Sequence, residues 1–265
     1  MKEVLIKEYN NTKINPIPFI PKKNEFKPTF INGCKLEILG EVEGKYKVEF
    51  IDNNTNSVFY ENEIQHNMWC KSNRKYFTDA TIKVTDLDSN EIAFEHSYDA
   101  KGKRVYIHFA SKALGDTIAW FPYAEEFRRK HKCQVIVSTF HNDFFTNTYP
   151  KIEFVSPGDE VHNLYAMYEI GWHYDNNQVD YDRHTLDFKT ISLQRASSDI
   201  LGLEHKEIKP RLSFANQGPF TKEDYICIAP HASAHAKYWN RPGGWQDVID
   251  HFNNKGYKVV MISKT

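Results

Sequence analysis

The pattern of hydrophobic and polar positions changes near residue 100. Before it, short stretches alternate apolar and polar residues and are rich in β-branched and aromatic side chains, which is typical of half-buried strands. These stretches are 34–40, 45–52, 57–64, 75–84 and 91–98. The sequence DNNTN between the second and third favours a turn and predicts a hairpin. We therefore expect a small all-β domain over residues 31–100, either a barrel or a sandwich.

From residue 104 the pattern predicts alternating strands and helices. Residues 104–109 (RVYIHF) are typical of a buried strand, and 116–131 place Trp120, Ala124 and Phe127 on one helical face. Pro122 should kink this helix because proline removes a hydrogen-bond donor. Apolar stretches within 133–140 and 151–159 complete a β-α-β pattern, and a later helix should end at Gly202. This predicts a Rossmann-like domain over residues 101–220.

A second β-α-β pattern begins near residue 225. The strand YICIAP is followed by the loop HASAHAKYWN, an amphipathic helix beginning in RPGGWQDV, and the strand YKVVMIS. One such unit cannot cover both faces of a sheet, so residues 221–265 are expected to be the incomplete start of a second Rossmann-like domain. At the other end, residues 1–30 contain four prolines and predict an extended arm.

Composition excludes several classes of protein. Lys and Arg total 34 against 35 Asp and Glu, so a nucleic-acid partner is not expected. No apolar run is long enough to predict a membrane span, and the N-terminal residues lack the pattern of a signal peptide. The four cysteines form no CxxC pair, which favours buried, reduced thiols in a cytoplasmic protein over a metal site.

The sequence SKALGDTIAWFP contains the first candidate for chemistry. We expect Gly115 to allow a tight turn after the strand and Asp116 to stand at the carboxyl end of the sheet, where open α/β folds bind ligands. A carboxylate there can accept a proton from a hydroxyl nucleophile. The alternative is that Asp116 only caps the following helix.

The loop before the second predicted helix contains the other candidates. Small residues, Ser233 among them, would let backbone amides approach a phosphate, and Lys237 would supply a positive charge. Trp239 offers an apolar or stacking wall, and the alternative is a solvated loop with a buried tryptophan. His231 and His235 have the spacing of a zinc pair, but no nearby carboxylate completes a site, so no metal is expected. Asp116 and Lys237 on facing walls would suit the transfer of a sugar from a nucleotide, because Lys237 could stabilise the departing diphosphate.

These motifs, in this order, resemble glycosyltransferase family 9, the ADP-heptose transferases, and within it the autotransporter O-heptosyltransferases (the TibC-like group). The segments SKALGDTIAWFPYAEEFRRKH, YPKIEFVSPG, NLYAMYEIGW, LQRASSDILGLEHKEIKPRL and IAPHASAHAKYWNRPGGWQDVI carry the resemblance, which covers most of residues 30–265. It implies a GT-B fold, with two Rossmann-like domains around a cleft and an added N-terminal β domain.

The resemblance also implies an activity. It is inverting, metal-independent transfer of heptose from ADP-heptose to serine hydroxyls of a protein acceptor. Asp116 falls on the proposed base, Lys237 on the diphosphate lysine and Ser233 on the small hydroxyl position, with His231 and Trp239 beside them. The four-cysteine iron motif and the later glycine-rich turn of the group are absent from this chain. Two alternatives stay open, a non-catalytic binding module and a transferase for another nucleotide sugar. A homo-oligomer is compatible with each of these three functions.

Overall fold

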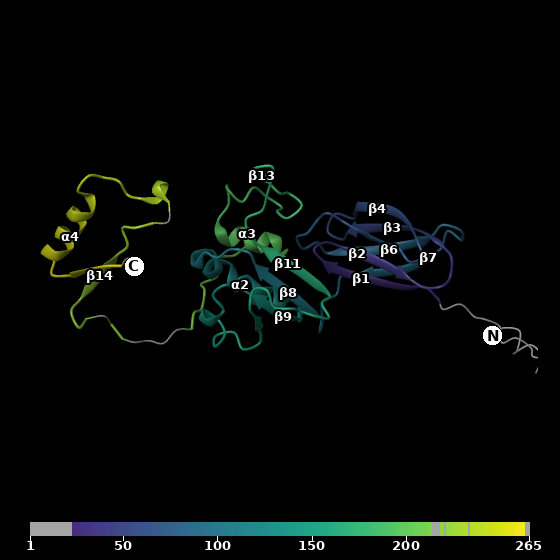
Figure 1. Ribbon diagram of the computed structural model, residues 1–265, viewed down its shortest axis with the longest axis horizontal. Helices are drawn as coiled ribbons and strands as arrows, with labels where there is room; N and C mark the ends of the chain where they lie inside the picture. The colour runs from purple at the N-terminus through teal and green to yellow at the C-terminus, as the bar shows by residue number, and fades with distance from the viewer. Residues whose placement is uncertain (1–22, 214–217, 220, 233, 263–265) are drawn as a thin grey trace, which may run out of the picture. The chain divides into compact units, whose positions relative to one another are not determined.

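The structure, a computed structural model, describes residues 23–213, 218–219, 221–232 and 234–262 (Figure 1). Most of the predicted arm, together with Ser233, therefore lies outside the described residues. The chain divides into two compact units, Met1–Phe214 and Ala215–Thr265. No helix in the described part of the chain combines the length and apolar character needed to cross a bilayer.

One sheet of the first unit is antiparallel, with the strand order β4-β3-β6-β7. Its strands are β3 (Lys45–Asp52), β4 (Ser57–Gln65), β6 (Ala80–Asp86) and β7 (Ile92–Ser97). The predicted hairpin is confirmed, because β3 and β4 pair on either side of residues 53–56. Alternation along β3 explains the strand, since Val48 and Phe50 are fully buried while Glu49 between them is partly exposed.

The other sheet of this unit has the order β10-β9-β8-β11-β1-β2-β5. Its strands are β1 (Glu25–Ile31), β2 (Lys35–Leu39), β5 (Trp69–Lys71), β8 (Arg104–Phe109), β9 (Gln134–Ser138), β10 (Glu153–Val155) and β11 (Ala166–Ile170). Neighbours from β10 to β1 are parallel, and the pairs β1-β2 and β2-β5 are antiparallel. The strand predicted at 104–109 is confirmed with the same bounds.

Strand β1 differs from the expected extended arm of residues 1–30. It pairs with β2 along Glu25–Thr29 and with β11 at Phe30 and Ile31. Pro28 lies where β1 pairs only with β2, and a residue without an amide hydrogen is tolerated at such an open edge. Strand β1 therefore joins the β-rich segment to the parallel strands within one sheet, so the structure does not separate residues 31–100 as a domain.

Helices α2 (Leu114–His131) and α3 (Leu193–Ile200) lie beside the parallel strands and contact each other. Helix α2 packs against β9 and buries Trp120, Phe121 and Phe127. It continues through Pro122 as one helix. Helix α3 ends as expected before Gly202, whose φ of +59° suits glycine. The short hairpin of β12 (Tyr174–Asp175) and β13 (Gln178–Val179) follows β11 and is absent from the sequence predictions.

The second unit contains the predicted β-α-β pattern. Strands β14 (Tyr225–Ile228) and β15 (Lys258–Met261) are parallel neighbours. Helix α4 (Gly244–Asn254) connects them and packs against β15. The short 3-10 helix η2 (His235–Lys237) interrupts the segment expected to be an irregular loop. This unit therefore brings the loop after β14 directly before a helix, as the sequence indicated.

Candidate active site

Asp116 lies in the first turn of α2, close to the carboxyl end of β8. The helix begins at Leu114 with Ala113 in the capping position, so the expectation that Asp116 caps the helix is wrong. A carboxylate in the first turn is favoured by the helix dipole whether or not it caps the helix. Capping was the alternative role because aspartate is common at that position, but the helix begins two residues before Asp116.

Two side chains donate hydrogen bonds to the same oxygen of Asp116. The Ser111 hydroxyl donates to Oδ2 at 2.7 Å, and the Trp172 indole Nε1 donates to Oδ2 at 2.9 Å. Ser111 Oγ in turn accepts the backbone N–H of Ala113 at 3.1 Å. Within the described residues, no hydrogen bond reaches Oδ1. The arrangement therefore holds a carboxylate by one oxygen and leaves the other able to accept a proton.

Trp172 is a site residue that the sequence analysis did not identify. It follows β11, and β11 pairs with β8 in parallel, so the segments after both strands emerge at the same edge of the sheet. The sequence does show a tryptophan two residues after a buried strand. The local pattern could not predict, however, that this strand would pair with β8. Ser111 stood inside a quoted motif without an assigned role.

Gly115 does not form the tight turn that was expected. It is the second residue of α2, it has no positive φ, and a Cβ at this position would meet no atom within 4 Å.

We expect Gly115→Ala to change the free energy of unfolding by less than about 0.5 kcal/mol, since no neighbouring atom has to move. Chemical denaturation of the variant and the parent chain measures this, and a loss above about 2 kcal/mol would contradict the open space.

The loop of the second unit presents its candidates to solvent. His231 and Lys237 are exposed, and Lys237 forms no salt bridge with any described residue. The Trp239 ring is 43% exposed and contacts Trp245 of α4 edge-to-face at 5.1 Å. The structure thus describes a free cation and a half-open aromatic surface just before a helix, while Ser233 is outside the described residues. Asp116 belongs to the first unit and Lys237 to the second, so their facing across a cleft stays a prediction.

The described residues contain no group of three or more histidines, cysteines or carboxylates placed to hold a metal ion. The rings of His231 and His235 lie near Tyr238, at 6.3 and 5.7 Å between centroids. Cys34, Cys70 and Cys133 are buried, and burial raises their pKa values to about 12, 11 and 11, which keeps them protonated and poor as ligands. Cys227 is exposed, so the expectation of four buried thiols is wrong for that residue.

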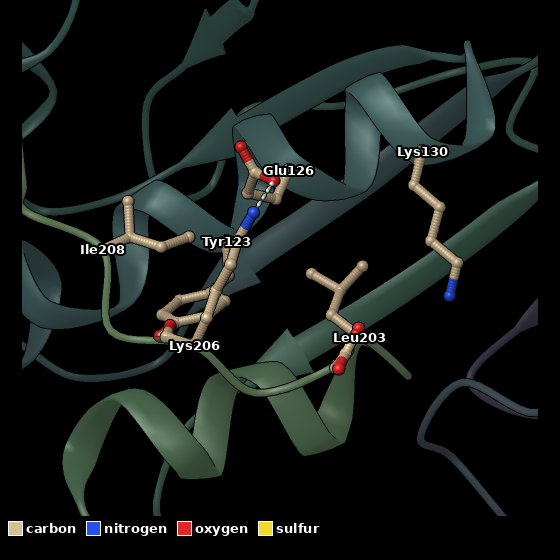
Figure 2. Close-up of a pocket in the computed structure, with 7 residues that line it drawn as sticks. Tyr123, Glu126, Lys130, Leu203, Lys206 and Ile208 are labelled. Atoms are coloured by element: carbon tan, nitrogen blue, oxygen red, sulfur yellow. Dashed lines mark hydrogen bonds and ion pairs between the residues drawn. The ribbon is translucent and has the colours of Figure 1, made fainter.

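A separate pocket of about 160 Å³ lies between α2 and the segment after α3 (Figure 2). Its lining residues are Tyr123, Glu126, Lys130, Leu203, Glu204, Lys206 and Ile208. Most of its polar groups are already paired, since Lys206 bonds Glu126 at 3.0 Å and Lys130 donates to the carbonyl of Gly202. Asp116 does not line it. We therefore place the candidate chemistry at Asp116 and not in this pocket.

The fold and the Asp116 geometry define an α/β protein with a candidate ligand site at the carboxyl ends of parallel strands. No protein-family profile matches the chain. The chain is 31% identical over 252 residues to the autotransporter heptosyltransferase Aah of Escherichia coli, covering 94% of this chain and 62% of Aah. It is 30% identical over 226 residues to the autotransporter heptosyltransferase TibC of Escherichia coli O78:H11, covering 84% of this chain and 54% of TibC.

Solved structures agree with the sequence matches. A crystal structure of TibC, described as a bacterial iron-containing dodecameric glycosyltransferase, has a TM-score of 0.82 at 28% identity, covering 94% of this chain and 64% of that one. A second TibC structure, in complex with ADP-D-β-D-heptose, has a TM-score of 0.79 at 29% identity, covering 89% of this chain and 61% of that one. The chain is thus related along most of its length to the autotransporter heptosyltransferases, and the resemblance is confirmed.

This chain spans 54 to 62% of the length of the curated relatives it matches. In addition, the inactive autotransporter heptosyltransferase BimC of Burkholderia thailandensis is 28% identical over 236 residues, covering 88% of this chain and 54% of BimC. TibC is described as iron-containing, but the described residues of this chain supply no such site.

Proposed function

We propose that the protein is an inverting glycosyltransferase that moves a heptose from ADP-heptose to serine hydroxyls of an autotransporter-type protein. The observation that carries this proposal is the carboxylate of Asp116, held through Oδ2 at the carboxyl ends of β8 and β11. The matches to heptosyltransferases, and the ADP-heptose complex of TibC, support the choice of donor. The proposal includes a GT-B arrangement, with Rossmann-like domains on the two sides of a cleft.

In the proposed reaction, Asp116 Oδ1 accepts the proton of the acceptor serine hydroxyl. The serine oxygen forms a bond to the anomeric carbon of the heptose from the face opposite the nucleotide. The bond from that carbon to the diphosphate oxygen breaks, and ADP leaves with the electron pair. Lys237 stabilises the negative charge on the departing diphosphate, with Ser233, His231 and Trp239 around it. The step as written balances without a metal ion.

We expect Lys237→Ala to weaken ADP binding about tenfold or more, because it removes the charged partner of the diphosphate. Calorimetric titration of the parent chain and the variant with ADP measures this. Lys255→Ala is a matched control, since Lys255 is also a lysine of the second unit and follows α4 at the opposite end from the loop. Equal affinity of the parent and Lys237→Ala would remove Lys237 from the donor site.

The proposed activity is tested by incubating the chain with ADP-heptose and a serine-containing passenger segment of an autotransporter. Intact-mass analysis should show the acceptor gaining one or more heptose units. A panel of ADP- and UDP-hexoses in the same assay separates a heptosyltransferase from a relative that uses another nucleotide sugar. Light scattering of the same sample tests the proposed homo-oligomer, for which the dodecameric TibC is the precedent.

A second candidate function is a non-catalytic module that binds a protein partner. The similarity to BimC, a relative named as inactive, supports this second function. This function predicts no mass gain in any donor mixture, and partner binding that Lys237→Ala does not change.

A nucleotide-sugar donor and buried free thiols both suit the cytoplasmic location expected from the sequence.

A further inference from the structure

The carboxylate of Asp116 is oriented by side chains from outside its own helix. Rotation about the last side-chain bond of aspartate is only weakly restricted, so a free Asp116 would present either oxygen in many directions. The bonds from Ser111 Oγ at 2.7 Å and Trp172 Nε1 at 2.9 Å both end on Oδ2. Hydrogen bonds to a charged acceptor are strong, so together they fix which oxygen faces away.

Trp172 is itself held by aromatic packing on two sides. Its ring contacts Trp120 of α2 edge-to-face at 5.1 Å and Phe188 at 5.0 Å between centroids. Trp120 is fully buried, and its indole donates to the carbonyl of Leu193 at 3.1 Å. Trp172 therefore contacts α2 directly through Trp120, which in turn bonds the first residue of α3, and this packing makes its indole N–H a rigid donor.

The loop that carries Trp172 is also fixed on its far side. The buried ring of His184 packs on Phe188 at 4.6 Å, and its Nε2 accepts the backbone N–H of His173 at 3.2 Å. Burial lowers the pKa of His184 to about 4, so the imidazole is neutral near pH 7 and remains an acceptor. The segment from Gly171 to Phe188 thus supports the position of the indole.

We propose that Trp172 is a positioning residue, which holds Oδ2 of Asp116 so that Oδ1 faces the acceptor hydroxyl. Ser111 is its partner in this role, because its hydroxyl donates to the same oxygen. This inference rests on the proposed function for its catalytic meaning. Asp116 receives both donors from outside its own helix, from the segments after two different strands, and forms no salt bridge with a described residue.

The first test measures the hydrogen bond without any transfer assay. In the full chain labelled with ¹⁵N-tryptophan, the Trp172 indole N–H resonance is assigned from its loss in Trp172→Phe, or by selective labelling if that variant does not fold. We expect Asp116→Asn to move this resonance, because an amide oxygen is a weaker acceptor than a carboxylate. Asp143→Asn should leave it in place. An unmoved resonance in Asp116→Asn would overturn the proposal, whatever the transfer activity is.

The second test is kinetic and separates positioning from packing. Trp172→Phe keeps an aromatic ring but removes the donor, and we expect kcat to fall about ten- to a hundredfold while KM for the donor sugar is unchanged. Tyr123→Phe is the matched control, because it also keeps an aromatic ring and removes a buried donor, the hydroxyl of Tyr123 on α2, whose acceptor is the backbone carbonyl of Lys206. Equal losses of kcat in both variants would overturn the positioning role. If the parent chain transfers no sugar, the proposed function fails, and the resonance test alone decides whether Trp172 orients Asp116.

Discussion

Asp116→Asn is expected to lower the rate of heptose transfer about 10²- to 10⁴-fold, the usual contribution of a general base. Asparagine has nearly the shape of aspartate, and its amide oxygen can still accept the bonds from Ser111 and Trp172. It cannot take a proton from the acceptor hydroxyl near neutral pH. The loss should therefore appear in the rate of the transfer step, which a single-turnover assay measures. The affinity for ADP should be unchanged.

Asp143→Asn provides a matched control for this variant. Asp143 is an exposed carboxylate in the first turn of η1 (Asn142–Phe144), after the strand β9 that neighbours β8. Among the described residues, no indole or hydroxyl donates to its carboxylate. We expect its transfer rate to stay within about twofold of the parent, since it is only a surface change. Full activity in Asp116→Asn would show that another group removes the proton.

Phe121→Ala is expected to lower the free energy of unfolding of the first unit by about 3–5 kcal/mol. The Phe121 ring has no exposed surface and stacks on Phe145 at 3.9 Å with an interplanar angle of 3°. It also contacts Tyr149 at 4.7 Å and Phe154 at 5.8 Å. The substitution removes a ring from between α2 and the segments around β9 and β10, which cannot close the cavity without moving. Denaturant unfolding followed by circular dichroism measures the loss.

Phe140→Ala is the control for the same chemical change at the surface. Phe140 is 40% exposed, and the ammonium of Lys112 lies 5.3 Å from the centroid of its ring. We expect a loss below about 1 kcal/mol, the value of an exposed cation–π contact. Similar losses in the two variants would mean that Phe121 is not a core residue in solution.

Local patterns predicted a helix or strand well where a short periodic pattern or a single glycine determines it. The alternating 45–52 and the apolar 104–109 became strands β3 and β8 because their buried positions repeat every second residue. Gly202 ended α3 because the chain there turns to a positive φ. The helix containing Asp116 was also found, but its first residue was misplaced, since Leu114 and Gly115 are poor signals for a helix start.

Long-range pairing could not be predicted from those patterns. That β1 would lie between β2 and β11 depends on Phe30 meeting Ala166, and no local signal links these residues. The same holds at the site, where Trp172 reaches Asp116 only because β11 adjoins β8. Local motifs indicated Asp116 and Lys237 and the resemblance to a known family gave them roles, whereas the donors around Asp116 required the structure.

The central place of β1 also constrains the order of folding. On the ribosome, β1 and β2 are made well before β11 and can pair as soon as they emerge, because they are close in sequence. The end of β1 that pairs with β11 stays open until residue 170 has been made. An open strand edge recruits other chains, and distant contacts form slowly. The interval before β11 docks is thus when newly made chains are most exposed to aggregation, and chaperone demand should fall once Ile170 has left the exit tunnel.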